Sequence, residues 1–176
     1  CVSLSWSLLP LPYAKLHVDG SLLGNPGFSG GGGIIRDHTG RVLQAFSTFY
    51  GPRTNLESEA MALLEGLRLC LSLGLPKLIV QMDSKQLLNM VQQTSAVPWQ
   101  LDTIIRQIRQ VLCSADCIVE HCYREVNSAA DILAKGAASS RKSATYDATI
   151  LPPRVKGISA LDTQQFPYFC LMRVRE

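Results

Sequence analysis

The sequence of 176 residues contains no long hydrophobic run and few charged side chains for its length. No apolar stretch approaches the roughly 18 residues that a membrane-spanning helix requires, so we expect no membrane partner. Charged residues account for 18% of the chain and hydrophobic residues for 47%, which excludes a charge-rich disordered protein. The length allows one domain with appendages but not two full domains.

The glycine-rich motifs that bind nucleotide phosphates are also absent. Neither GxGxxG nor GxxxxGK(S/T) occurs, although residues 30–33 form a run of four glycines. Because no helix is expected directly after this run, we favour tight packing within a sheet over a phosphate cradle.

A zinc site is not expected, although six cysteines are present. No set of cysteines and histidines has zinc spacing, and Cys117 and Cys122 lie at an odd separation in one predicted strand, on opposite faces. A chain this rich in Leu, Ile and Val needs no disulfide staples. We therefore expect reduced, structural thiols and an intracellular protein of the nucleus or cytoplasm.

The two ends of the chain differ from its centre. Residues 1–13 are apolar, contain prolines and carry no charge, which indicates an arm or linker, and they lack the basic start of a secretion signal. Residues 14–140 hold the periodic segments of one domain, and residues 141–176 are expected to be an extension, partly ordered at best. Because the first residue is Cys1, we expect either a fragment of a larger polyprotein or a trimmed monomer.

The small positive charge of the protein resides in that extension. Residues 1–140 contain 11 basic and 11 acidic side chains, whereas residues 141–176 contain six basic and three acidic ones, so the net charge of +3 arises wholly from the tail. A bias of this size permits a polyanionic partner without requiring one.

Hydrophobic periodicity predicts an α/β fold. Three extended segments with short connections predict an antiparallel meander, and strands that alternate with helices after it predict parallel crossover units. A capping box at Thr54–Glu57 opens the first helix and Gly74 ends it. We therefore expect a five-stranded mixed sheet flanked by helices. The expected strands are 15–21, one beginning at 30–37, 41–50, 77–83 and 117–123, and the expected helices are 55–73, 85–93, 99–112 and 127–140.

Four carboxylates lie where predicted strands end or helices begin. Asp19 and Asp83 end strands, and Glu59 and Asp131 lie in first helical turns. Singly, each has an ordinary explanation as a turn or helix-dipole residue, and Asp131 could form a surface pair with Lys135 worth about 0.3–0.5 kcal/mol. Jointly, such positions converge at one edge of an α/β sheet, where the mutual repulsion favours a hard divalent cation such as Mg²⁺ or Mn²⁺.

The residues around these carboxylates carry a specific resemblance. The blocks HVDGSLLGNPGFSGGGGIIRDHTG, TNLESEAMALLEGL, VQMDSKQL and REVNSAADILAKGA occur in this order over residues 14–140. Together they resemble the type 1 ribonuclease H family, and more closely the short-loop, reverse-transcriptase-like RNase H domains of plant retroelements. The resemblance implies an RNase H-like fold, in agreement with the predicted order of elements.

The resemblance also implies an activity and a metal site. Asp19, Glu59, Asp83 and Asp131 match the four metal-binding and catalytic carboxylates of the family, which hydrolyses the RNA strand of RNA/DNA hybrids. Two Mg²⁺ ions, with Mn²⁺ as a substitute, would generate the attacking hydroxide and stabilise the leaving 3′ oxygen.

Several substrate contacts are implied in the same way. Asn25 and Asn55 match positions that read RNA in the minor groove, where the 2′ hydroxyl distinguishes RNA from DNA. Thr54 matches a contact to a DNA phosphate, although its hydroxyl is also expected in the capping box. Lys85 stands where the family has a substrate-contacting glutamine.

The sequence departs from the family in the loop before the last helix. Many members carry a longer loop there, with a histidine that assists proton transfer and product departure, whereas YREVN closes the gap here. Arg124 could replace that histidine or pair with Glu120 or Glu125, and His121 is either an auxiliary residue or merely packed. A basic, aromatic protrusion is also missing. The alternative function is therefore a weakly active or inactive nucleic-acid-binding module of retroelement origin.

Overall fold

The computed structural model describes residues 2–7, 9–24, 27–75 and 77–170. The strands are β1 (Val2–Leu4), β2 (Ala14–Gly24), β3 (Gly27–Arg36), β4 (Val42–Arg53), β5 (Lys77–Met82), β6 (Asp116–His121), β7 (Ala144–Tyr146) and β8 (Tyr168–Cys170). The helices are α1 (Asn55–Ser72), α2 (Lys85–Val91), α3 (Asp102–Cys113), α4 (Ser128–Ser140) and α5 (Pro153–Thr163), and a 3₁₀ turn spans Trp99–Leu101. None of the helices in these described ranges is long and apolar enough to cross a membrane.

The main sheet has six strands in the order β6-β5-β2-β3-β4-β7. Strands β2, β3 and β4 form the predicted antiparallel meander, and β5 and β6 run parallel to β2. The predicted α/β mixed sheet is therefore confirmed, with one strand more than the five expected. The additional strand is β7, which pairs with β4 through residues 144–146 and is too short to give a hydrophobic period.

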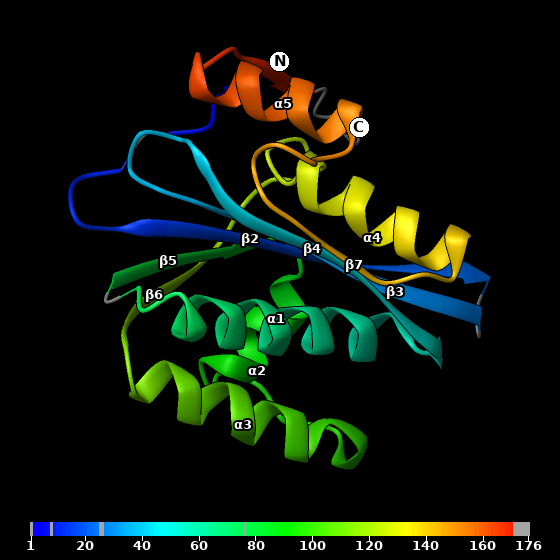
Figure 1. Ribbon diagram of the computed structural model, residues 1–176. Coiled ribbons are helices and arrows are strands. Elements are labelled where there is room, and N and C mark those ends of the chain that lie inside the picture. Colours follow the sequence, from blue (N-terminus) through cyan, green and yellow to red (C-terminus); the bar gives the residue numbers. More distant parts are fainter. Residues whose placement is uncertain (1, 8, 25–26, 76, 171–176) are drawn as a thin grey trace, which may run out of the picture.

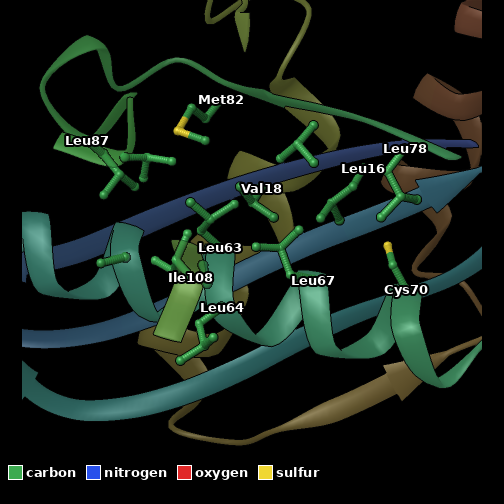
Figure 2. Packing of buried hydrophobic residues seen from close by; sticks show 14 of the residues in the cluster. Leu16, Val18, Leu63, Leu64, Leu67, Cys70, Leu78, Met82, Leu87 and Ile108 are labelled. Atoms are coloured by element: carbon green, nitrogen blue, oxygen red, sulfur yellow. The ribbon is translucent and has the colours of Figure 1, made fainter. Parts of the chain in front are cut away.

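Helices cover both faces of this sheet (Figure 1). Helices α4 and α5 lie on one face, whereas α1, α2 and α3 lie on the other. The larger core fills the second layer, where Leu63 and Leu67 of α1 pack against Leu16 and Val18 of β2 (Figure 2). Burial of these apolar side chains is the main favourable contribution to folding.

The glycine run of β3 packs tightly on both faces, as favoured from the sequence. A Cβ atom on Gly30 would lie 2.6 Å from the carbonyl oxygen of Ala134 in α4, and one on Gly31 would lie 2.5 Å from the ring of Tyr50. The glycines therefore admit a helix backbone on one side and an aromatic ring on the other. Sheet packing explains the run without a phosphate cradle.

The first long helix begins with the predicted capping box. The Thr54 hydroxyl accepts a hydrogen bond from the Glu57 amide at 3.3 Å, and the Glu57 carboxylate accepts one from the Thr54 amide at 2.8 Å. These bonds satisfy two backbone donors at the start of α1 and fix where the helix begins. The position of this helix start matters for the candidate site.

The tail that we expected to be partly ordered at best contains β7, α5 and β8. Strand β8 pairs with β1, so that the arm and the tail meet. Asp162 of α5 forms an ion pair with Arg36 of β3 at 2.9 Å, and both side chains are 1% exposed. Trp6 of the arm is buried with its ring 5.4 Å from the Arg36 guanidinium. Because α5 buries polar residues such as Ser159 and Asp162, its sequence lacks a hydrophobic period.

We expect the Arg36–Asp162 pair to make the tail necessary for full stability. Asp162→Asn leaves the Arg36 guanidinium buried without its counter-charge, which should lower the free energy of unfolding by about 3–5 kcal/mol. The control Asp116→Asn breaks an exposed pair with Lys77 and should cost about 0–1 kcal/mol. Urea unfolding of the full chain measures both changes. Equal losses in the two variants would contradict a structural role for the tail.

Candidate active site

Two of the four predicted carboxylates lie where strand β5 ends. The parallel pairing of β2 with β5 runs to His17 opposite Gln81, so Asp19 lies on β2 just beyond it. Asp83 follows directly after the last residue of β5. Asp19, 7% exposed, is therefore buried close to the end of β5.

Glycine contacts bring two helices to the same place. A Cβ atom on Gly20, the residue after Asp19, would lie 2.4 Å from the backbone nitrogen of Glu59 in α1. Gly32 is the cross-strand partner of Asp19, and a Cβ atom there would lie 2.5 Å from the carbonyl oxygen of Ala130 in α4. The missing side chains let α1 and α4 approach β2 and β3 closely. Glu59 and the residue after Ala130, Asp131, consequently reach the surroundings of Asp19.

Three of the carboxylates act electrostatically on the fourth, Asp19. Burial, and then the negative charges of Asp83, Asp131 and Glu59, raise the pKa of Asp19 from 3.8 to about 8. Burial also raises the pKa of Glu59, although hydrogen bonds from the side chains of Ser84 and Asn55 oppose that shift. Because ionisation of these carboxyl groups is unfavourable, a bound cation would stabilise their ionised form.

The side chains of Glu59 and Asp131 are held by neighbours. Asn55 donates a hydrogen bond to the Glu59 carboxylate at 2.7 Å, and the Asp131 carboxylate lies 2.7 Å from the Lys135 ammonium group. In the described ranges, no three acidic, cysteine or histidine side chains stand close enough to enclose one metal ion. The all-oxygen donor set of the four carboxylates fits a hard divalent cation.

Asn127 is a site residue that the sequence did not reveal. It precedes α4 and is 1% exposed, and its side-chain amide donates to the Val18 carbonyl at 2.9 Å and to the Asp83 carboxylate at 3.3 Å. It therefore ties the end of β5 to the backbone beside Asp19. An asparagine before a helix suggests a cap, but Asn127 makes no capping bond, so its role depends on long-range contacts.

Two of the predicted substrate-contacting or auxiliary residues contact the candidate carboxylates, and two others are described elsewhere on the surface. Asn55 contacts Glu59, and the Arg124 guanidinium lies 3.9 Å from the Asp131 carboxylate. Lys85 is exposed at the first residue of α2, and His121 is half-buried in β6. The His121 ring meets Tyr123 edge-on, with ring centroids 5.9 Å apart. Asn25 lies outside the described residues.

The sequence and fold place this chain in a known family. Residues 17–137, more than two thirds of the chain, match the profile of the reverse transcriptase-like family. The chain belongs to the reverse transcriptase-like family. The family was expected from the motif blocks, and the profile confirms that expectation. All four carboxylates and the glycine run lie inside the matched region.

A sequence relative and several solved structures are ribonucleases H by name. A protein of Arabidopsis thaliana, provisionally named a ribonuclease H protein, is 28% identical over 138 residues, which are 77% of this chain but only 22% of that protein. The N-terminal RNase H domain of Rv2228c from Mycobacterium tuberculosis has a TM-score of 0.67 and 27% identity, with 72% of this chain and 98% of that one covered. LC11-RNase H1, isolated from compost, has a TM-score of 0.70 and 27% identity, with 74% and 99% covered.

We expect Asp19→Asn to stabilise the metal-free protein more at high pH than at low pH. The folded protein keeps a proton on Asp19 up to about pH 8, whereas the unfolded chain loses it near 3.8, so wild-type stability falls as pH rises through that window. Asparagine does not titrate, and the gain at alkaline pH should be on the order of a few kcal/mol. Urea unfolding with a chelator at acidic and alkaline pH measures it. A gain independent of pH would contradict the shift.

Proposed function

We propose that this domain is a metal-dependent endonuclease that hydrolyses the RNA strand of RNA/DNA hybrids. The observation that carries the proposal is the raised pKa of the buried Asp19 carboxyl, caused by burial and then by the negative charges of Asp83, Asp131 and Glu59. Membership of the reverse transcriptase-like family supports it, as does the fold shared with LC11-RNase H1. That protein has also been solved in complex with an RNA/DNA hybrid, in a structure 26% identical to this chain with a TM-score of 0.68.

In the proposed mechanism, Asp19, Glu59, Asp83 and Asp131 hold two Mg²⁺ ions, or Mn²⁺ in their place. Asp19 is the most buried of the four, and the other three act on it from α1, from α4 and from the residue after β5, so it would be the central residue of the metal-binding set. Bound divalent cations supply the Lewis acidity that lowers the pKa of an attacking water and offsets charge on the leaving 3′ oxygen. Asn127 holds Asp83 in place, and Asn55 and Ser84 hold Glu59.

The start of α1 is proposed to bind both strands of the hybrid. The Thr54 hydroxyl uses an acceptor position for the helix cap, so its own proton remains able to bond a phosphate oxygen. The two roles that competed for this hydroxyl are therefore compatible. Asn55 donates through its amide nitrogen to Glu59, which leaves its carbonyl oxygen as an acceptor for a 2′ hydroxyl.

Three further residues are proposed as auxiliary contacts. Arg124 is 72% exposed near Asp131, where it could take over product departure from the histidine of longer-loop members. Its recorded ion pair is with Asp131 rather than with the Glu120 or Glu125 considered from the sequence. Lys85 is free to reach a phosphate from the start of α2. Asn25 retains its predicted role in the minor groove.

The alternative function is a weakly active or inactive nucleic-acid-binding module of retroelement origin. One observation favours it: Asp131 is already neutralised by Lys135 and approached by Arg124. An ion pair as exposed as that of Lys135 is worth little, about 0.2–1 kcal/mol, and a divalent cation competes with it effectively. We therefore favour the enzyme.

The deciding experiment is cleavage of a labelled RNA/DNA hybrid by the full chain with Mg²⁺ or Mn²⁺. We expect the wild-type protein to cut only the RNA strand, leaving 5′ phosphate and 3′ hydroxyl ends, and Asp83→Asn to lower the rate at least about 100-fold, comparable to the loss of one transition-state contact. Asp116→Asn, an exposed carboxylate in β6, should cut at the wild-type rate. Two outcomes would favour the alternative: Asp83→Asn cleaves the hybrid at the wild-type rate, or neither the wild-type protein nor any variant cleaves it.

The chain spans about a fifth of the length of its plant relative. We propose that it acts as one domain of a longer polyprotein, within the nucleus or cytoplasm.

A further inference from the structure

The tail adds cations to one side of the molecule. Among its acidic residues, Asp162 is buried against Arg36, so it does not offset charge at the surface. Lys142, Arg154 and Lys156 are exposed, the first after α4 and the others in α5. On the opposite face, Arg106 pairs with Asp102, and Arg109 donates hydrogen bonds to backbone carbonyls. The exposed cations of the tail therefore lie at the end of α4 and in the first half of α5.

Two adjoining cavities lie along the exposed side of α4. The first, of about 380 Å³, lies between α4 and the start of α5 and is lined by Asp131, Ile132, Lys135, Gly136, Ser139 and Arg154. The second, of about 370 Å³, lies between α4, β7 and the segment before α5. Ile132 and Gly136 line both, so the two cavities adjoin along α4, and together we call them the α4 groove.

Gly136 keeps the α4 groove open at its midpoint. A Cβ atom on Gly136 would meet nothing within 4 Å, so packing does not require glycine there. Glycine inside a helix costs about 1 kcal/mol relative to alanine. Glycine at this position therefore destabilises the helix without being required by packing. Its missing side chain leaves room where the two cavities adjoin.

The chemistry of the α4 groove matches a nucleic-acid backbone. One end is walled by Asp131 of the candidate active site. Arg154 lines the first cavity beside Lys135, whose ammonium group pairs with Asp131, and Lys142 lines the second cavity together with Ile132, Leu133 and Pro152. Cations and hydroxyls bind phosphates, and apolar side chains pack against sugars, without any selection of sequence.

We propose that the α4 groove holds the sugar–phosphate backbone of the nucleic-acid strand that passes the carboxylate site, beyond the base-paired part of the substrate. This inference rests on the proposed function for the identity of the strand. Ala144 and Tyr146 of β7, Pro152 and Arg154 line the groove, and all lie outside the family-matched residues 17–137. The proposal therefore gives the tail a role in substrate binding. The groove binds this backbone wherever the strand continues as single-stranded RNA.

The test compares a short blunt RNA/DNA hybrid with the same hybrid whose RNA strand is extended on its 5′ or 3′ side. Binding is measured by fluorescence anisotropy with the full chain, in an Asp83→Asn background that keeps the RNA intact. We expect one of the two extensions to tighten binding about tenfold. Arg154→Glu should abolish that gain and reduce the slope of log affinity against log salt concentration by about 0.7, the value for one single-strand phosphate contact.

Matched controls come from α5 itself. Lys156→Glu changes the net charge as Arg154→Glu does, two residues away, but Lys156 lines neither cavity, so the gain should persist. Gly136→Leu fills the groove without changing charge and should abolish the gain, whereas Gly157→Leu, also in open space, should keep it. Thermal unfolding verifies that each variant folds.

The outcomes separate the groove from the proposed function. No gain from either extension, or equal losses in Arg154→Glu and Lys156→Glu, would overturn the groove. If the blunt hybrid is not cut at all while the gain depends on Arg154 and Gly136, the groove stands and the proposed function fails.

Discussion

The candidate site depends on two places where a helix backbone touches a strand backbone. Gly20 admits α1 beside Glu59, and Gly32, directly across the strand pair from Asp19, admits α4 beside Ala130. Any side chain at either glycine would push a helix outwards, and with it one carboxylate. The two layers on opposite faces of the sheet thus meet around one aspartate, which neither layer could surround alone.

This arrangement is costly for the protein without a cation. Burial and three nearby carboxylates oppose ionisation of Asp19, so the site lowers stability at neutral pH. Compensation comes from elsewhere: the apolar core between α1 and β2, the capping box of α1, and the buried pair that ties α5 to β3. Functional sites commonly sacrifice stability in this way, and a buried carboxyl with a strongly raised pKa marks a candidate site of this kind.

The sequence predicted the parts of the fold that are periodic or carry local signals. The apolar stripe of α1, its capping box and the meander each have a sequence signal within a few residues, and the motif blocks located the four carboxylates. Asn127, β7 and α5 have no such local signal. Asn127 bonds to Val18 and Asp83, far from it in sequence, and α5 buries Asp162 because Arg36 lies opposite. Buried polar contacts between distant segments have no hydrophobic period, so only the folded chain reveals them.

The same contacts bear on where the functional unit ends. The body of the chain is electrically neutral, and the arginines of α3 are committed to Asp102 and to the backbone, so the net positive charge that a polyanion would meet comes from the tail. The buried Arg36–Asp162 pair neutralises one acidic group of the tail inside the protein, which leaves the cations beside it facing solvent. The ion pair that anchors α5 therefore also makes its surface positive. A substrate-binding unit that ends at residue 137 would lack both the ion pair that anchors α5 and the positive surface of that helix.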